Sequence, residues 1–448
     1  MTLINEFPKI LEASKKVFED IKTIDFDVKQ EINCQENVEP NVLALGDNIQ
    51  FMRYLLLEKN FAGKIKMIYI DPPFFSKANY DAVLHLTTKD GSKLPAVKHF
   101  AYEDIWQKDM TGYLTMLCQR LLLMKELLAE DGTIWVHLDW HVVHYVKIFL
   151  DEIFGQDNFV NEIIWHYKSG GSGKRHFAKK HDTILVYSKS KKYYFATPKE
   201  KSYNRGFKPY RFKGVKEYRD EMGWYTMVTM KDVWQVDMVG RTSSERTGYA
   251  TQKPEALIQR VVESATEEGD ICADFFCGSG TLGAVCEKSG RRWICCDQSR
   301  LAVTASMKRL HFLGASVKVL EEHKRTEETS ENCRAEFDVT CQDVTGSDKS
   351  IINIELKNYF LKKLPESLDE VGKNTISSVL KENPLSLVDY WSVDFDFDGK
   401  IFKPDVFLAR DRGKMIPVNC EKLCPKNKIR RICIRIVDVL GNETFSYI

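Results

Sequence analysis

Two short apolar segments, far apart in the chain, each end in an aspartate that is followed by a tight loop. The first is Ile65–Ile70, which leads into the Asp-Pro-Pro-Phe sequence of Asp71–Phe74. The second is Ile271–Ala273, which leads into Asp274 and a glycine-rich loop. Each is typical of a strand that delivers a carboxylate to the carboxyl edge of a parallel sheet, where open α/β folds bind their ligands. The pair therefore predicts one ligand site built from two distant parts of the sequence.

From Val42 onward, strand-like and helix-like patterns alternate along most of the chain. This alternation predicts an α/β fold with a doubly wound, mainly parallel, Rossmann-like sheet covered by helices on both faces. The 448 residues leave room for two or three domains, and short alternating stretches near the C-terminus indicate a small β-sandwich. We expect an N-terminal extension at 1–40, two halves of the α/β domain at 41–189 and 249–320, an irregular region between them at 190–248, a linker at 321–350 and a small β-rich domain at 351–448.

Positive charge is concentrated in one stretch of a nearly neutral chain. The formal net charge is +1, yet between Lys168 and Arg219 the basic residues far outnumber the acidic ones and alternate with aromatic ones. Lysine and arginine neutralise phosphates, so this stretch predicts a nucleic-acid-binding surface, with an ordinary solvated face as the alternative. Within it, Gly170–Arg175 is typical of a flexible basic loop that orders on DNA.

The loop after Asp274 carries the pattern of a cofactor-binding turn. Gly278, Gly280 and Gly283 fit the Gly-x-Gly-x-x-Gly sequence, in which glycines let the backbone approach a ligand closely. Asp297 follows near the spacing of a ribose-binding acid. The carboxylate of Asp274 would repel a pyrophosphate but suits the ammonium of a methionine-like tail. A Walker phosphate loop is disfavoured because no Gly-Lys-Ser/Thr sequence is present here.

Together, Asp71–Phe74 and Asp274–Thr281 resemble the catalytic and cofactor motifs of amino-methyltransferases that use S-adenosylmethionine (SAM). The motif order is circularly permuted, with the catalytic motif first. It resembles that of the β-class DNA methyltransferases, which include many adenine-specific and type III modification enzymes. Further matches extend the resemblance over roughly residues 40–313. One departure is Phe275, which stands where the family usually has a proline.

This resemblance implies roles for the matching residues. It makes 41–189 the catalytic half, 190–248 the target-recognition region and 249–320 the SAM-binding half. It places the glycine loop at the methionine end of SAM and Asp297 at the ribose hydroxyls. Lys253, in a Thr-Gln-Lys-Pro-Glu sequence, would lie beside the cofactor carboxylate, and Asp47 would meet the adenine edge. The full set of expected cofactor-binding residues is Asp47, Asp71, Lys253, Asp274, Phe276, Gly278, Ser279, Gly280, Thr281 and Asp297.

The expected catalytic residues are Asp71, Pro72, Pro73 and Phe74. An exocyclic amino group of a nucleobase is a poor nucleophile because its lone pair is delocalised into the ring. Two acceptors, the Asp71 carboxylate and the Pro72 carbonyl, would hold its hydrogens and direct the lone pair at a methyl group. Phe74 offers a stacking face that only a base flipped out of the duplex reaches. An aspartate in the first position resembles adenine-N6 enzymes, whereas cytosine-N4 enzymes usually carry serine.

The resemblance implies a SAM-dependent enzyme that methylates the N6 amine of a flipped adenine in double-stranded DNA, as part of a restriction-modification system. Two alternatives stay open: a cytosine-N4 methyltransferase with the same machinery, and a catalytically silent DNA-binding partner subunit. Type III modification subunits usually dimerise and pair with a helicase-nuclease restriction subunit. We therefore expect a homodimer and, as a possible partner, such a subunit.

Other features indicate no metal and no membrane. Several of the 12 cysteines lie in predicted core strands, and Cys420 and Cys424 have loose metal-ligand spacing without a second pair. His137, Asp139 and His141 also look like a metal cluster, but we interpret them as sheet-end structure. Apolar runs are too short to span a bilayer, so we expect a cytoplasmic protein.

Overall fold

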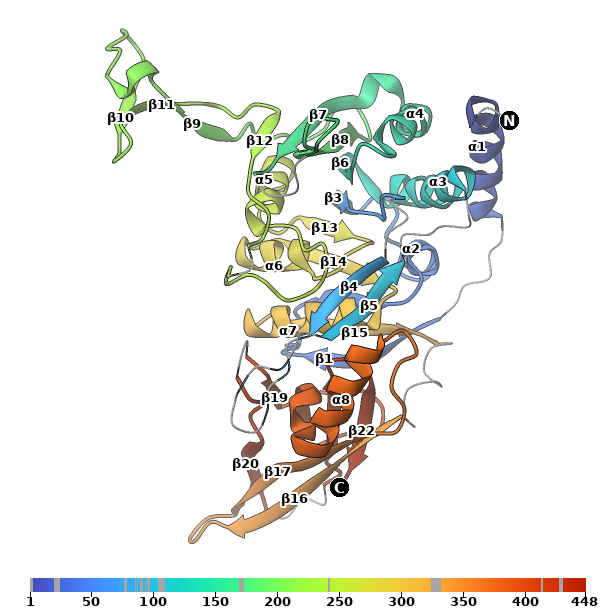
Figure 1. Cartoon of the computed structure of the whole chain (residues 1–448), viewed down its shortest axis with the longest axis vertical. Coiled ribbons are helices and arrows are strands. Elements are labelled where there is room, and N and C mark those ends of the chain that lie inside the picture. The colour runs from blue at the N-terminus through green and yellow to red at the C-terminus, as the bar shows by residue number, and fades with distance from the viewer. Residues whose placement is uncertain are drawn as a thin grey trace.

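The computed structural model describes most of the chain and places its parts along one long axis (Figure 1). The central α/β domain lies between a small sheet that projects at one end and a β-rich domain at the other. The described residues are 3–19, 25–75, 79–84, 86, 88, 92, 94, 97–103, 109–168, 173–240, 242–323, 332–411, 414–426 and 430–448.

Within these residues, the central sheet has ten strands in the order β1-β15-β2-β14-β13-β3-β6-β8-β7-β12. The strands from β15 to β6 are parallel to one another, and β8 runs antiparallel to both of its neighbours. The doubly wound, mainly parallel sheet is therefore confirmed. The strand bounds are β1 Phe26–Ile32, β2 Asn41–Leu45, β3 Ile65–Ile70, β6 Leu128–Leu138, β7 Phe159–His166, β8 His181–Ser188, β12 Val233–Gln235, β13 Ile271–Asp274, β14 Arg292–Asp297 and β15 Val317–Glu322.

Helices cover both faces of the sheet. Successive residues of β3 point to opposite faces of the sheet, and both faces are buried. Ile68 and Ile70 belong to one buried cluster, whereas Met67 and Tyr69 belong to another. A strand buried on both sides reads as a continuous apolar run, as Ile65–Ile70 does. The first cluster is closed by α1 (Phe7–Lys15), α2 (Asn48–Leu57), α3 (Met110–Leu127) and α4 (Val143–Phe154), and the second by α5 (Glu255–Ala265), α6 (Thr281–Lys288) and α7 (Arg300–Phe312).

The N-terminal region does more than extend the chain. Its strand β1 adds an antiparallel edge to the central sheet by pairing with β15, and α1 packs against α3. The expectation of a separate extension at 1–40 missed this edge strand, whose sequence alternates between buried residues and half-buried charged ones.

Two insertions leave the central sheet. The first is an antiparallel hairpin of β4 (Asn79–Leu84) and β5 (Val97–Glu103), in the stretch that follows the Asp-Pro-Pro-Phe loop. The second lies in the irregular region at 190–248. There β9 (Lys199–Tyr203), β10 (Glu217–Arg219) and β11 (Trp224–Thr229) form the projecting antiparallel sheet, before β12 returns to the central sheet (Figure 1).

The C-terminal domain, from β16 to β22, is built from two antiparallel sheets and one helix. Between the sheets lies a core that includes Tyr359, Trp391 and Ile434. Part of the linker expected at 321–350 is in fact strand β16, whose exposed face carries polar residues and so hides the strand pattern. The elements are β16 Cys333–Asp343, β17 Lys349–Leu361, α8 Glu370–Glu382, β18 Val388–Asp394, β19 Val406–Ala409, β20 Asn419–Pro425, β21 Cys433–Asp438 and β22 Glu443–Tyr447.

None of the helices in the described part of the chain combines the length and the apolar content that crossing a bilayer requires.

Candidate active site

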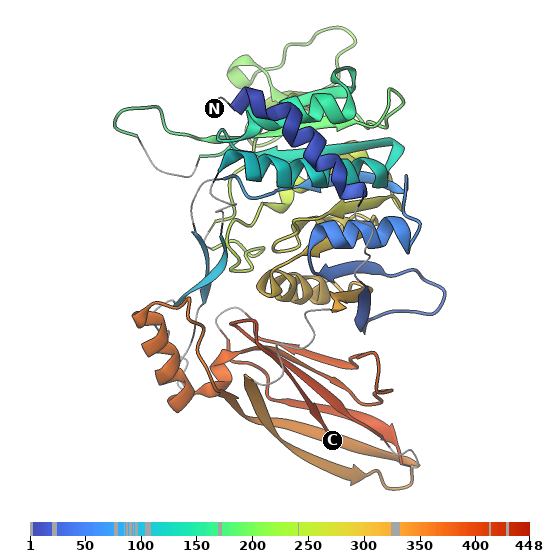
Figure 2. The same cartoon turned by 90° about the vertical axis from the view of Figure 1, so that its right-hand side faces the viewer.

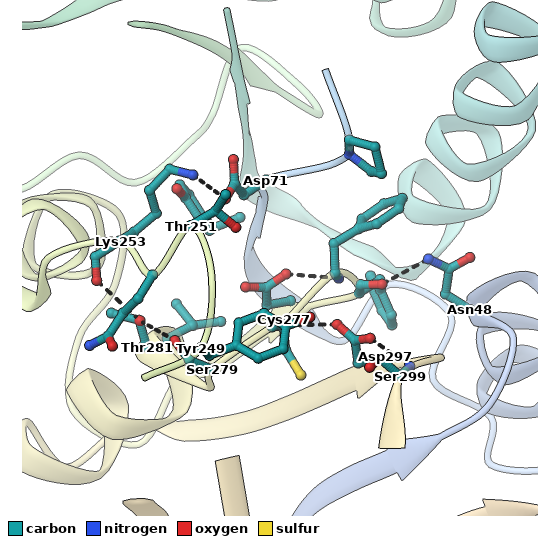
Figure 3. A pocket seen from close by; sticks show the side chains of 18 of the residues that line it. Asn48, Asp71, Tyr249, Thr251, Lys253, Cys277, Ser279, Thr281, Asp297 and Ser299 are labelled. Atoms are coloured by element: carbon teal, nitrogen blue, oxygen red, sulfur yellow. Dashed lines mark hydrogen bonds and ion pairs between the residues drawn. The ribbon is translucent and has the colours of Figure 1, made fainter. Parts of the chain in front are cut away.

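The two acidic loops predicted from the sequence open into one cavity of about 450 Å³ (Figure 3). The strands that carry them, β3 and β13, are parallel neighbours, with Met67 opposite Cys272 and Ile68 opposite Ala273. On the other side of β13 lies β14, which ends in Asp297. Of the expected site residues, the cavity is lined by Asp71, Pro73, Lys253, Asp274, Phe276, Gly278, Ser279, Thr281 and Asp297.

The two carboxylate oxygens of Asp71 have different surroundings. Its Oδ2 forms an ion pair with Lys253, from the segment that precedes α5 (Figure 3). Its Oδ1 is buried and has no hydrogen-bond partner among the residues that the structure describes. A buried carboxylate oxygen without a donor is costly, so this atom is placed to accept a hydrogen bond from a ligand. The predicted position of Lys253 beside a cofactor carboxylate stays a prediction, since here it contacts Asp71.

Phe74 directly follows the cavity-lining residue Pro73 and packs beside His137. Its ring lies 5.9 Å from the ring of His137, and Lys253 Nζ is 5.4 Å from the Phe74 ring centroid. His137 is fully buried at the end of β6, where Nδ1 contacts the Tyr69 hydroxyl at 2.8 Å and Nε2 contacts Asp182 at 3.3 Å. Both imidazole nitrogens are thus engaged, which fixes the surface that supports Phe74.

Asp139 and His141, the neighbours that resembled a metal cluster, bind each other at 2.6 Å. In the described part of the chain, no group of three or more His, Cys, Asp or Glu side chains is placed to hold a metal ion. Cys420 and Cys424 are both buried in β20.

Asp274 is held by the loop that it begins. Its Oδ1 accepts a hydrogen bond from the backbone N–H of Phe276 at 2.9 Å. Burial raises the pKa of Asp274 well above its ordinary value, although the Phe276 N–H opposes that rise. The negative charges of Asp71 and Asp297 raise this pKa further. A positively charged ligand group next to Asp274 would relieve this repulsion.

The glycines of the cofactor loop, residues 274–281, let it close tightly. Gly278 donates its N–H to Asp297 Oδ2 at 2.9 Å, which ties the ends of β13 and β14 together. Gly280 caps α6 in the left-handed conformation, with φ of 69°. A Cβ at this position would lie 2.7 Å from Ser306 Oγ, so only glycine fits.

Phe275, which replaces the family's usual proline, is anchored by its surroundings. Its side chain is fully buried and packs near Phe51 of α2, and its carbonyl accepts a hydrogen bond from Asn48 at 2.8 Å. Asn48 in turn accepts one from Arg120 Nε at 2.6 Å. Tertiary contacts therefore hold the cofactor loop at the position where a proline would have stiffened it.

Asp47, expected at the cofactor adenine, is outside the cavity lining. Its carboxylate caps α2 by accepting the N–H groups of Ile49 at 2.9 Å and Gln50 at 3.1 Å, and it forms an ion pair with Arg120. The helix amino terminus thus gives Asp47 a structural role that the motif comparison did not reveal. Pro72, Phe74 and Gly280 also lie outside the lining.

Sequence reasoning missed several residues that do line the cavity. Tyr249 covers the glycine loop, and a Cβ at Gly278 would lie 3.4 Å from its ring. Asn48 and Arg120 enter from α2 and α3. Arg120 directly precedes the apolar run Leu121–Met124 and is buried, and an arginine beside such a run is a signal that the sequence offered.

Comparison with known proteins supports the same reading of these motifs. Residues 65–308, more than half of the chain, match the family model described as DNA methylase, which groups N6 and N4 methyltransferases. The chain is similar to the type II methyltransferase M.EcaI of Enterobacter cloacae, with 29% identity over 330 residues that cover 60% of this chain and 69% of the relative. It is also similar to the DNA adenine methyltransferase YhdJ of Escherichia coli (strain K12), with 23% identity over 261 residues, 57% of this chain and 79% of the relative.

The chain is also similar to the Mod subunit of the type III restriction-modification enzyme EcoP15I of Escherichia coli, with 30% identity over 160 residues. This shorter match covers 34% of this chain and 24% of that subunit. The resemblance seen in the sequence is therefore confirmed: the chain belongs to the N6/N4 DNA methylase family.

Proposed function

We propose that the protein transfers a methyl group from SAM to the exocyclic N6 amine of adenine in double-stranded DNA, as the modification enzyme of a restriction system. The observation that carries the proposal is the joint cavity of Asp71 and Asp274, in which Asp71 Oδ1 is a buried acceptor that awaits a donor. An amino group offers such a donor, whereas a ring nitrogen without hydrogen does not.

The residues of the cavity suit SAM. Asp274 provides a buried carboxylate for an ammonium, and Asp297 brings a second carboxylate for ribose hydroxyls. Gly278 lines the cavity and carries no side chain of its own, so a ligand can approach its backbone closely. When bound, SAM supplies a methyl group on a positively charged sulfur, which the surrounding carboxylates favour electrostatically.

The chain's own residues orient the amine. In this proposal the Asp71 carboxylate accepts one amine hydrogen and the Pro72 carbonyl accepts the other, so that the nitrogen lone pair is directed away from the ring. Phe74, backed by His137, stacks on the base. The ion pair with Lys253 keeps the Asp71 carboxylate in place. The excess proton of the methylated amine is lost to water.

The projecting β9–β11 sheet is the part of the chain that we assign to DNA. Phe207 and Phe212 are 51% and 63% exposed beside the lysines and arginines of the same region. Exposed aromatic and basic residues together suit bases and phosphates. In the predicted basic loop Gly170–Arg175, residues 170–172 lie outside the described residues, and Lys174 and Arg175 are exposed.

The named relatives favour adenine and a restriction context. YhdJ is named an adenine methyltransferase, and the EcoP15I relative is named a Mod subunit. The aspartate at position 71 also favours adenine-N6 over cytosine-N4. The homodimer and the helicase-nuclease partner stay predictions.

The test is incubation of the full chain with methyl-labelled SAM and unmethylated genomic DNA, followed by nucleoside analysis. We expect labelled N6-methyldeoxyadenosine with the wild-type protein and none with Asp71→Ala. Labelled N4-methyldeoxycytidine would instead identify the cytosine alternative. SAM binding without any transfer would identify a silent partner subunit, and label only in RNA would overturn the DNA substrate.

A further inference from the structure

The hairpin that follows the catalytic loop is anchored in the C-terminal domain. Figure 2 shows β4 and β5 bridging the central domain and helix α8. The hairpin continues beyond β4, because Leu94 donates its N–H to the Leu86 carbonyl at 3.0 Å. Leu86 and Val97 are 1% and 2% exposed, and both belong to the buried cluster of the C-terminal domain rather than to either cluster of the central sheet.

Helix α8 packs closely against this hairpin. At Gly372, in its first turn, a Cβ would lie 3.2 Å from Val97 Cγ1, so the absence of a side chain permits the close contact. Because both aliphatic side chains are almost fully buried, the anchor is more than a surface contact. The catalytic loop, residues 71–75, thus follows β3 in the chain and precedes a hairpin that packs into the C-terminal domain.

A second contact joins the C-terminal domain to the cofactor side of the cavity. Glu443 of β22 is 7% exposed and binds Arg435 Nε at 2.6 Å and Arg300 Nη1 at 2.7 Å. Arg300 also forms an ion pair with Glu321 of β15. Removing one member of such a buried network leaves an uncompensated charge, so the contact is energetically significant.

Arg300 begins α7 directly after a residue of the cavity. Ser299 lines the cavity, caps α7 with its side chain and donates its N–H to Asp297 Oδ1 at 2.8 Å. The backbone that carries Asp297 is thus continuous with the arginine that Glu443 holds. A shift of Arg300 would move this turn and with it the carboxylate expected at the ribose.

We propose that the C-terminal domain is a positioning element that holds the two halves of the active site through separate contacts. The Leu86–Val97 anchor positions the catalytic loop, and the Glu443–Arg300 pair positions the turn at Asp297. The inference rests on the proposed function, because it assigns one contact to methyl transfer and the other to SAM binding. Leu86, Val97, Arg300 and Glu443 are positioning residues, since none of them lines the cavity.

The first test uses Glu443→Gln in the full chain. The dissociation constant for SAM, measured by calorimetry, should rise about fivefold or more, while the transfer rate at saturating SAM stays near that of the wild type. Arg300→Met should raise the SAM dissociation constant by a similar factor. Arg300→Lys, which keeps the charge, should retain much of the wild-type affinity for SAM. The matched control is Glu355→Gln, which removes an exposed ion pair with Lys357 in the same domain. An unchanged SAM affinity in Glu443→Gln, or an equal loss of affinity in the control, would overturn the role proposed for the Glu443–Arg300 pair.

The second test uses Leu86→Ala and Val97→Ala. The single-turnover rate at saturating SAM and DNA should fall about 10- to 100-fold, because small misplacement of a catalytic group is costly, and SAM affinity should be unchanged. The matched control is Ile434→Ala, which opens a cavity in the same core at a strand of the C-terminal sheet. Thermal unfolding checks that all three are folded at the assay temperature.

The inference fails if Leu86→Ala and Val97→Ala transfer at the wild-type rate, or if Ile434→Ala slows transfer equally. Failure of the proposed function looks different, because then the wild-type protein itself would transfer no methyl group to DNA.

Discussion

The catalytic loop and the cofactor loop begin alike and are built differently. Each starts with an aspartate at the end of a parallel strand, and the two strands are neighbours. The cofactor loop turns directly into α6, and its aspartate is bonded to Phe276 two residues further on. Among the described residues, Asp71 accepts no such bond from its own loop. Asp71 takes its partner, Lys253, from the other half of the domain.

This difference indicates that the two loops have separate roles, one in cofactor binding and the other in methyl transfer. The cofactor loop obtains much of its geometry locally, through glycines and a helix start, and is further held by Asn48 and Asp297. The catalytic loop depends on distant parts, namely Lys253, His137 behind Phe74, and the hairpin seated in the C-terminal domain. Its geometry therefore depends on the assembly of the whole molecule.

The largest effect is expected at Asp71. Asp71→Asn keeps the shape of the side chain but removes the charge, and it places donor hydrogens beside Lys253 and the incoming amine. Loss of one preorganised group at a reacting centre costs about 100- to 1,000-fold in rate. Single-turnover transfer should fall by that amount while SAM affinity, measured by calorimetry, is retained. Strong loss of SAM affinity would place Asp71 in cofactor binding instead.

The next effect is expected at Asp274. Asp274→Asn removes a charge-assisted hydrogen bond worth about 1.5–3 kcal/mol, so the dissociation constant for SAM should rise about 10- to 100-fold. The raised pKa of Asp274 also predicts a pH dependence. Because the ionised form binds the ammonium, binding releases a proton, and SAM affinity should increase as pH rises through this pKa. Calorimetry across pH should show this slope for the wild type and a flatter one for Asp274→Asn; equal slopes would contradict the assignment.

A variant of Lys253 would distinguish between two roles for this residue, orienting Asp71 and binding the cofactor carboxylate. If it orients Asp71, as the ion pair indicates, Lys253→Met should lower the transfer rate at saturating SAM about tenfold, in line with loss of a positioned partner. If it binds the cofactor carboxylate, the SAM dissociation constant should rise while the saturated rate is kept. We expect the first result. The matched control is Lys288→Met, which removes the partly exposed partner of Glu255 nearby.

The smallest effect is on stability and tests the local construction of the cofactor loop. Gly280→Ala should lower the free energy of unfolding by about 2–4 kcal/mol, combining left-handed strain with the clash at Ser306. Gly314→Ala is the control, because its φ of 73° is similar but nothing lies within 4 Å of a Cβ there. It should cost about 1 kcal/mol. Equal denaturant midpoints for the two variants would show that the Ser306 contact is unimportant.

Much of this arrangement could be predicted from the sequence because it follows strand ends. Parallel strands bring their carboxyl ends to one edge, so Asp71, Asp274 and Asp297 could be expected together. Tyr249 and Asn48 could not, since they reach the cavity from a loop and a helix whose positions depend on packing. Asp47 matched a motif, yet its carboxylate caps α2.

The ends of the chain were less predictable for a related reason. Strands β1 and β16 lie at sheet edges, where their polar residues are half-buried in β1 and mostly exposed in β16, so both sequences mix charged and apolar residues like a linker. The packing of the β4–β5 hairpin into the C-terminal core could not be predicted from the sequence either. Leu86 and Val97 stand in a polar stretch, and only the fold shows which domain buries them.

The most direct test of this account is the single-turnover rate of methyl transfer, measured against SAM concentration for Asp71→Asn and Asp274→Asn side by side. We predict that excess SAM restores much of the rate in Asp274→Asn and leaves Asp71→Asn slow at every concentration. Restoration of Asp71→Asn by SAM, or a rate in Asp274→Asn that no concentration of SAM improves, would contradict the assignment of transfer to one strand end and binding to the other.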